Sequence, residues 1–176
     1  GCAHPWRFAQ PQSGYRSLRF EVLAHPFAVL SHSRGTTRCA LRSFGSFVAA
    51  ATKVEVVNNK VNVLEMHTAV DCGIVVTPDR VKAQMEGAMI FGLSIALMGE
   101  ISVENGQVQQ TNFHDYPVTR MNQVPELHVH IVESEAPPGG IGEPGVPPVA
   151  PSITNAIYHA SKIRIRDVPI NKVFTV

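Results

Sequence analysis

Apolar and polar residues alternate on both sides of a short polar turn in the first half of the chain. In SFVAAATKVEVV, residues 46–57, Val54 and Val56 fall on one face, as expected for a strand with one buried side. The Asn-Asn-Lys sequence at 58–60 is typical of a turn. VNVLEMHTAV, residues 61–70, resumes the alternation and places on one face Val61, Val63, Glu65 and His67. The two segments are predicted to form a β-hairpin.

The apolar spacing changes from two residues to three or four in DRVKAQMEGAMIFGLSIALMG, residues 79–99. This spacing predicts an α-helix whose apolar face is formed by Val81, Met85, Ala88, Met89, Gly92 and Ala96. Thr77 suits the N-cap and Pro78 the first turn. Gly87 and Gly92 each cost up to ~1 kcal/mol relative to alanine inside a helix, so we expect another backbone or a ligand to approach closely there.

The remaining patterns complete an α+β order of elements. Asn-Gly at 105–106 lies between GEISVE and QVQQTNF and predicts a second hairpin. ELHVHIVES, residues 126–134, predicts a strand, and APSITNAIYHASK, residues 150–162, predicts an amphipathic helix. Residues 1–40 show no clear period and are expected to be irregular. We therefore predict β-hairpins and a mixed sheet with two main helices.

Composition excludes several classes of function. The chain has 176 residues, of which 44% are hydrophobic, and 15 basic side chains balance 14 acidic ones. This balance favours neither nucleic acid nor a membrane surface as a partner. The longest nearly uninterrupted apolar run, residues 87–98, is shorter than the ~20 residues that a membrane-spanning helix needs. The first residues contain no visible secretory signal. No CxxC spacing joins Cys2, Cys39 and Cys72, which argues against a disulfide framework or a thiolate zinc site.

The stretch GGIGEPGVPP, residues 139–148, is here called the glycine–proline loop, and it holds one ionisable group, Glu143. Its glycines leave backbone N–H groups uncovered, and they are Gly139, Gly140, Gly142 and Gly145. Its three prolines restrict the loop to few conformations. A carboxylate held in such a loop can act as a general base. Composition alone favours the alternative, an exposed turn whose glutamate is incidental.

Two further stretches are candidate binding elements. Gln84 lies one helical turn before Ala88, beside Gly87, and its amide can donate and accept hydrogen bonds to a polar ligand. The pattern alone favours an ordinary surface glutamine. Asp71 and Gly73 stand at the end of a strand that leads to a helix, a place where phosphates often bind. The alternative there is a turn in which Asp71 bonds its own backbone.

Histidines provide two weaker candidates. His128 and His130 alternate on one strand face and could share a metal ion. Without a third ligand nearby, an exposed strand face is the favoured interpretation. His114 and Asp115 suggest a catalytic dyad, but neighbouring residues in a sequence seldom face each other, so we disfavour it.

Three stretches together resemble a known family. They are DCGIVVTPDRVKAQMEGAMIFGLSIALMGE, TNFHDYPVTRMNQVPELHVHIV and PPGGIGEPGVPPVAPSITNAI, in this order and spacing. The set is similar to the C-terminal part of the molybdenum-binding large subunit of the xanthine dehydrogenase and aldehyde oxidase family, in the branch of isoquinoline 1-oxidoreductase beta subunits. The resemblance covers residues 41–176, which it identifies as a molybdopterin-binding C-terminal domain. Residues 1–40 match poorly.

The resemblance implies roles for individual residues. Glu143 would be the general base that takes a proton from the attacking hydroxyl group as an electron-poor carbon of an N-heterocycle or aldehyde is oxidised with water-derived oxygen. Gln84 would hydrogen-bond the pterin cofactor. Asp71 and Gly73 match the strand end that packs near that cofactor. Gly87 and the loop glycines Gly140, Gly142 and Gly145 would shape the cofactor site. No protein side chain would ligate the molybdenum, because the pterin holds it.

The resemblance also implies partners. The cofactor would be molybdopterin cytosine dinucleotide, the usual bacterial form. Iron–sulfur clusters would lie on a separate small subunit, since three unpatterned cysteines cannot hold them. The family subunit is several times longer, so the chain would be a fragment that lacks the N-terminal part of the large subunit and is inactive alone. Cytoplasm and periplasm both stay open as its location. The alternative function is a non-catalytic remnant or a protein-binding module.

Overall fold

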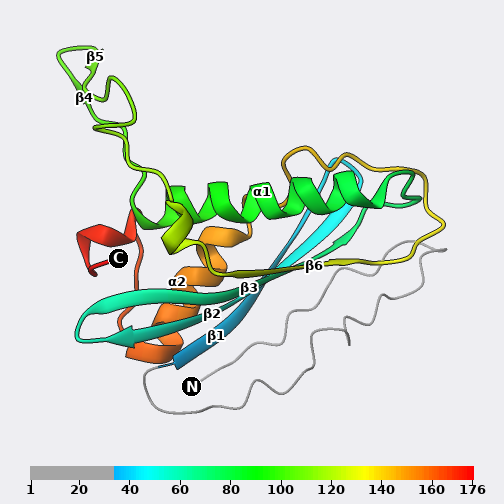
Figure 1. Cartoon of the computed structure of the whole chain (residues 1–176), viewed down its shortest axis with the longest axis horizontal. Coiled ribbons are helices and arrows are strands. Elements are labelled where there is room, and N and C mark those ends of the chain that lie inside the picture. The colour runs from blue at the N-terminus through cyan, green and yellow to red at the C-terminus, as the bar shows by residue number, and fades with distance from the viewer. Residues whose placement is uncertain (1–33) are drawn as a thin grey trace.

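The computed structural model describes residues 34–176, which form a four-stranded sheet with two helices packed against one of its faces (Figure 1). The strands are β1 (Arg34–Ser43), β2 (Ser46–Val57), β3 (Lys60–Asp71) and β6 (Glu126–Ile131), in the spatial order β1-β2-β3-β6. The first three pair antiparallel, whereas β6 runs parallel to β3. The predicted α+β class with a mixed sheet is therefore confirmed.

The two predicted helices are present as α1 (Pro78–Leu97) and α2 (Val149–Ser161). Thr77 occupies the N-cap of α1 and Pro78 its first turn, although the Thr77 hydroxyl makes no capping hydrogen bond. A Cβ on Gly92 would lie 2.7 Å from the Cβ of Val149, so this glycine lets α1 pack closely on α2. The core between helices and sheet contains Met66, Met89, Leu93, Ile153 and Ile157, all fully buried.

The predicted hairpin of β2 and β3 is present, but its side-chain alternation is interrupted. Val54 pairs with Val63 and Lys53 pairs with Glu65, so Leu64 is an extra residue in β3, a β-bulge. A bulge moves the residues beyond it to the other face. Val63 therefore faces the helices with Val54, whereas Glu65 and His67 face away from them, and our prediction of one shared face is wrong.

Strand β1 corrects the prediction for the start of the chain. Residues 34–40, expected to be irregular, belong to this strand. The Thr37 hydroxyl donates to the Ser152 carbonyl of α2 (2.8 Å), and buried Thr52 and Ser152 share a hydrogen bond of 2.7 Å between their hydroxyls. These bonds anchor α2 across β1 and β2. The rest of the segment, including Cys2, lies outside the described residues.

A hairpin projects from the body beyond the C-terminal end of α1 (Figure 1). It contains β4 (Val103–Glu104) and β5 (Gln107–Val108), and residues 99–119 are called the hairpin arm below. Asn105 and Gly106 have positive φ angles of 49° and 79°, as the predicted Asn-Gly turn requires. The second predicted hairpin is thus confirmed, although each of its two strands is only two residues long. The short 3₁₀ helices η2 (Met121–Gln123) and η3 (Ile170–Lys172) complete the fold.

No helix within residues 34–176 is long and apolar enough to cross a membrane.

Candidate functional site

The glycine–proline loop is fixed to the body by backbone hydrogen bonds. The N–H of Gly139 donates to the carbonyl of Cys72, at the end of β3, and the N–H of Gly140 donates to the carbonyl of Phe44, in the β1–β2 turn; both distances are 2.8 Å. Ile74 donates its N–H to Ala136, just before the loop (2.9 Å). Two segments far apart in sequence therefore hold the loop entrance in one position.

Three loop glycines are required by close packing. A Cβ on Gly139 would lie 2.5 Å from the Ser46 hydroxyl oxygen, and one on Gly140 would lie 2.9 Å from the Cβ of Phe44. At the other end of the loop, a Cβ on Gly145 would lie 2.7 Å from the Cβ of Ala88 in α1. Because these contacts involve both the β1–β2 turn and α1, the loop is clamped between them.

Gln84 of α1 contacts the centre of the loop. Its side-chain Nε2 donates to the carbonyl of Gly142 over 3.2 Å. Gly87 lies one turn further along the same exposed face of α1, and neither Gly87 nor Gly142 has an atom within 4 Å of the position of a Cβ. Gln84, Gly87 and Gly142 are therefore all exposed where α1 meets the loop, and a side chain at either glycine would meet no described group.

Glu143 follows Gly142 directly and is exposed. Its carbonyl accepts a hydrogen bond from the N–H of Val146 (3.0 Å), which closes a turn just before α2. Within residues 34–176 its carboxylate has no hydrogen-bond or salt-bridge partner. The carboxylate is thus on a fixed backbone next to the Gln84 contact and is available to a ligand.

Asp71 and Gly73 form a turn that packs against the residues just before the glycine–proline loop. The carboxylate of buried Asp71 accepts the N–H of Gly73 at 3.1 Å. Gly73 has a φ of 73°, and a Cβ there would collide with the carbonyl oxygens of Pro137 and Ala136. The turn with a backbone-bonded aspartate, one of the two alternatives from the sequence, is the arrangement that forms.

Phe44 also borders this region, and the sequence did not single it out. It lies in the β1–β2 turn with a φ of 50° and is 66% exposed, although it is a large apolar side chain. Its carbonyl and Cβ are the groups that contact Gly140. An aromatic residue directly before a glycine, just ahead of the strand predicted at 46–57, was the available signal.

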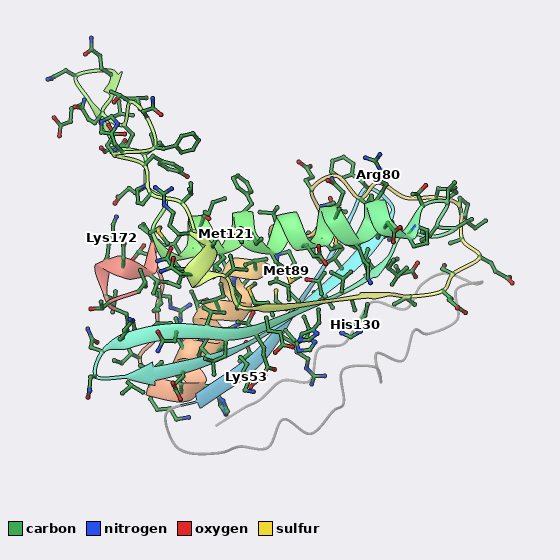
Figure 2. All side chains as sticks on the ribbon, in the orientation of Figure 1. Lys53, Arg80, Met89, Met121, His130 and Lys172 are labelled. Atoms are coloured by element: carbon green, nitrogen blue, oxygen red, sulfur yellow. The ribbon has the colours of Figure 1, made fainter. Side chains whose placement is uncertain are left out.

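The sheet face turned away from the helices carries a second group of titratable residues. His67 of β3 lies opposite His128 of β6 with ring centroids 4.3 Å apart, and its Nδ1 is 3.3 Å from Nε2 of His130. Figure 2 shows His130 and the core residue Met89 on opposite sides of β6. The sequence paired only His128 and His130, because the parallel pairing of β3 and β6 is not visible locally.

Burial shifts the titration of this histidine cluster. The pKa of His67 is lowered first by burial and then by the charges of His128 and His130, against the opposing effect of Glu65. Burial, with a smaller effect of His128, also lowers the pKa of His130. Within the described part of the chain no group of three or more side chains is arranged to hold a metal ion. We interpret the cluster as stacked histidines on a sheet face, in which burial disfavours protonation of His67 and His130.

His114 and Asp115 do contact each other, with 3.5 Å between Nε2 and Oδ2, although we expected adjacent residues not to meet. They lie on the hairpin arm, away from the loop. The backbone N–H groups of Asn112 and Thr111 lower the pKa of Asp115 to about 2. The carboxylate is therefore a strongly ionised cap for the arm backbone, which does not suit a proton-accepting dyad.

Comparison with known proteins shows which family the chain belongs to. The sequence model of the molybdopterin cofactor-binding domain matches residues 26–125. The chain is 45% identical over 112 residues to isoquinoline 1-oxidoreductase subunit beta from Brevundimonas diminuta, an alignment that covers 64% of this chain and 14% of the relative. It is 41% identical over 101 residues to a membrane-bound aldehyde dehydrogenase (pyrroloquinoline-quinone) from Gluconacetobacter polyoxogenes, covering 57% of this chain and 13% of that one.

Solved structures share the fold. Quinoline 2-oxidoreductase from Pseudomonas putida 86 superposes with a TM-score of 0.65 at 23% identity, over 71% of this chain and 17% of that one. Aldehyde oxidoreductase from Desulfovibrio gigas superposes with a TM-score of 0.61 at 21% identity, over 70% of this chain and 14% of that one.

The chain thus spans only a small part of the length of the relatives it matches. The match covers more than half of the chain, and it includes Gln84, Gly87 and the strand end at Asp71. The chain belongs to the molybdopterin cofactor-binding domain family and corresponds to the C-terminal part of a molybdenum-binding large subunit of the xanthine dehydrogenase and aldehyde oxidase family.

Proposed function

We propose that this chain supplies the catalytic glutamate and part of the cofactor site of a molybdenum hydroxylase. The observation that carries the proposal is the hydrogen bond from Gln84 to the Gly142 carbonyl, which holds Glu143 beside the open face of α1. The relatives named for isoquinoline and aldehyde oxidation support an N-heterocycle or an aldehyde as the substrate class.

The exposed residues around the Gln84–Gly142 contact fit a pterin cofactor. Gly87 and Gly142 have no side chains and no close neighbours, so a bulky group can approach the backbone there. The amide of Gln84 offers donor and acceptor groups to the polar edge of a pterin. A bound molybdenum cofactor supplies the two-electron oxidation of carbon with oxygen derived from water. Of the other assigned residues, Gly140 and Gly145 fix the loop, and Asp71 and Gly73 support it.

Glu143 is the proposed general base. Its carboxylate Oε would accept the proton of the attacking hydroxyl group while a substrate lies over the loop. The glycine contacts and prolines hold the carboxylate in place, so little orientation is lost before proton transfer. A base is most effective when water is excluded around it. Glu143 is exposed in residues 34–176, so we assign this exclusion to parts of the subunit outside this chain.

We extend the proposal to cofactor form and partners. The pterin would be the cytosine dinucleotide form, and electrons would leave through iron–sulfur clusters on a separate small subunit. The N-terminal part of the large subunit would complete the cofactor envelope. The boundary of the domain at residue 41 stays a prediction, and the family match begins earlier, at residue 26. The isolated chain should therefore show no turnover, and turnover with about one molybdenum per chain would contradict this.

The test is the substitution Glu143→Gln in a full-length subunit in which this chain replaces the matching segment of the Brevundimonas diminuta relative. Loss of a general base should lower kcat by about 10²–10⁴-fold, with molybdenum content unchanged. The matched control is Glu135→Gln, an exposed glutamate just before the loop, which should leave kcat unchanged. Wild-type activity of the Glu143→Gln enzyme would refute the assignment and favour the alternative, a non-catalytic module.

A further inference from the structure

The hairpin arm exposes several large apolar side chains. Residues 100–109 are all exposed, and the exposed large apolar side chains of the arm are Ile101 at 55% exposure, Val103 at 61%, Val108 at 54% and Phe113 at 66%. Val103 and Val108 are direct cross-strand partners, so their side chains lie together. Such a group of apolar side chains on a projecting element is typical of an interaction surface.

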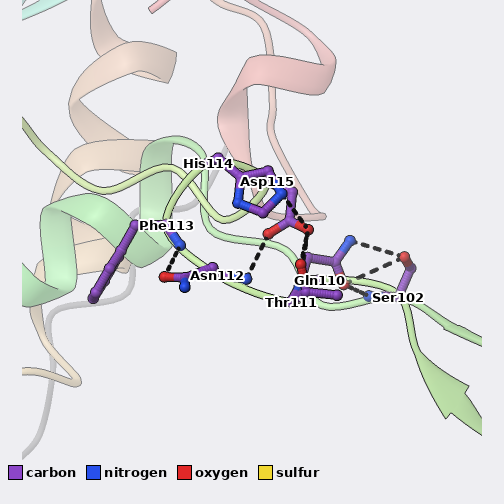
Figure 3. Close-up of polar contacts among 7 residues, drawn as sticks. All are labelled: Ser102, Gln110, Thr111, Asn112, Phe113, His114 and Asp115. Carbon is purple, nitrogen blue, oxygen red and sulfur yellow. Dashed lines mark hydrogen bonds and ion pairs between the residues drawn. The ribbon is translucent and has the colours of Figure 1, made fainter.

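The arm is nevertheless ordered by its own polar contacts (Figure 3). Asp115 accepts the N–H groups of Thr111 and Asn112 and the Thr111 hydroxyl, each at 2.9 Å. The Gln110 side chain accepts the N–H of Ser102 at 2.7 Å and so joins the two sides of the hairpin. A two-stranded hairpin is marginally stable by itself, so these contacts replace the hydrophobic core that the arm lacks.

The base of the arm is clamped to α1. The Ser94 hydroxyl lies 2.8 Å from that of Thr119 and accepts the Thr119 N–H at 3.0 Å. A Cβ on Gly99 would lie 2.9 Å from the Tyr116 hydroxyl oxygen, so the hydroxyl end of this side chain lies against the first residue of the arm. The arm therefore leaves α1 in a defined direction and is prepared for contact without first having to fold.

The charge of the arm has one sign. Its acidic residues are Glu100, Glu104 and Asp115, and residues 99–119 contain no lysine or arginine. Glu100 is paired with Lys172 of η3, however, and Asp115 accepts hydrogen bonds from the arm backbone. Of these three, only the Glu104 carboxylate lacks such a contact within residues 34–176, so a surface that accepts the arm should be mainly apolar.

We propose that the hairpin arm is a docking element whose occupant is the remainder of the molybdenum-binding polypeptide, outside this chain. The chain matches only 14% of the isoquinoline relative, so most of such a subunit is available to cover the arm. A segment of the same polypeptide also has a higher effective concentration than any separate partner. This inference rests on the proposed function only in so far as it needs a longer subunit; it does not need catalysis.

The experiment uses the full-length chimeric subunit described above, with a photoreactive amino acid in place of Val103, and maps the cross-linked peptides by mass spectrometry. We expect cross-links within one polypeptide, to residues outside this chain. Cross-links to a second copy, to a small separate subunit or to nothing would each overturn the proposal. A loss of activity or molybdenum with intact intramolecular cross-links would refute the proposed function and leave the docking element in place.

A pair of variants tests the apolar contact itself. With the photoreactive group at Val108, Val103→Asp should lower the cross-link yield at least about tenfold, because a carboxylate buried against an apolar groove lacks a partner. Gln109→Asp adds the same charge on an exposed side chain of the arm and should leave the yield unchanged. Equal yields in both variants would show that the apolar pair is not buried and would contradict the proposal. Thermal unfolding of the isolated 176-residue chain, unchanged by either substitution, controls for the fold.

Discussion

The glycine–proline loop and the hairpin arm both contact α1, at opposite ends, and they keep their shapes by different means. The loop is held by backbone hydrogen bonds to Cys72 and Phe44 and by glycines at positions where a side chain does not fit. The arm is held by side chains that cap backbone groups, with Asp115 at their centre. The loop has close contacts with three other segments, whereas the arm contacts the body at its base.

The two ways of holding the backbone suit the two proposed tasks, catalysis for the loop and docking for the arm. A backbone fixed from several sides holds one carboxylate, Glu143, in a defined place, as a catalytic group requires. An arm with its own polar scaffold keeps apolar side chains exposed without collapsing onto the body, as a docking element requires. The first region should therefore be sensitive to added volume, and the second to loss of a cap.

The largest effect should come from a matched pair of glycines with positive φ. Gly73→Ala adds strain and a collision with the Pro137 carbonyl, and it should destabilise the isolated chain by about 3 kcal/mol. Gly106→Ala in the arm adds strain without a collision and should cost about 1 kcal/mol. Denaturant unfolding measures both values. Equal losses of stability would show that the turn at Gly73 is no more constrained than the turn at the tip of the arm.

A second pair compares positions within the loop. Gly139→Ala places a Cβ against Ser46 and should cost about 2 kcal/mol. Gly142→Ala meets no atom and should change stability by less than about 0.5 kcal/mol. In the full-length chimera the order should reverse for cofactor content, with Gly142→Ala losing molybdenum, because its methyl group would enter the proposed pterin space. Normal molybdenum content in the Gly142→Ala variant would contradict the proposed position of the pterin beside Gly142.

The sheet face that carries His67 and His130 should respond to pH. The pKa values of His67 and His130 are lowered in the folded chain, so the unfolded chain binds more protons below the ordinary histidine pKa. Stability should be complete above pH 6.5 and should fall as the pH decreases toward the lowered values. His130→Gln should flatten this slope in thermal unfolding scans between pH 7 and pH 5.

The smallest global effect, and a clear local one, should come from Asp115→Asn. The folded pKa of Asp115 is about 2, below its ordinary value, so its contribution is present above the unfolded pKa and is lost as the pH falls toward 2. In the variant, amide exchange at Thr111 and Asn112 should accelerate, while exchange at Gly139 and Gly140 stays slow. Faster exchange at the loop would mean that the two regions are not independent.

The sequence was sufficient for elements with local periodicity. The β2–β3 hairpin and both helices follow from repeats of two and of three to four residues, and the Asn-Gly pair gave the arm its turn. The bulge at Leu64 was not predicted because it depends on pairing with β2. The strand at 34–43 was not predicted because its residues are mostly polar or small. Length and register across a sheet are set by partners that a single segment does not reveal.

The candidate site was predictable only in its residue types. Composition alone favoured an exposed turn in which Glu143 is incidental. The catalytic role of Glu143 was suggested only by the resemblance of the ordered motifs to a known family. The contact between Gln84 and Gly142 joins positions far apart in the chain, and the role of Phe44 beside Gly140 depends on the same fold. Glu143 is exposed within residues 34–176, because no described segment covers that side of the loop.

The length of α1 has a consequence for how such domains diversify. Its 20 residues extend over about 30 Å, with Gln84 near the start and the Ser94 clamp near the end. The two proposed tasks are thus separated along one helix, so the surface proposed to cover the arm can change between relatives without moving the backbone that carries Glu143.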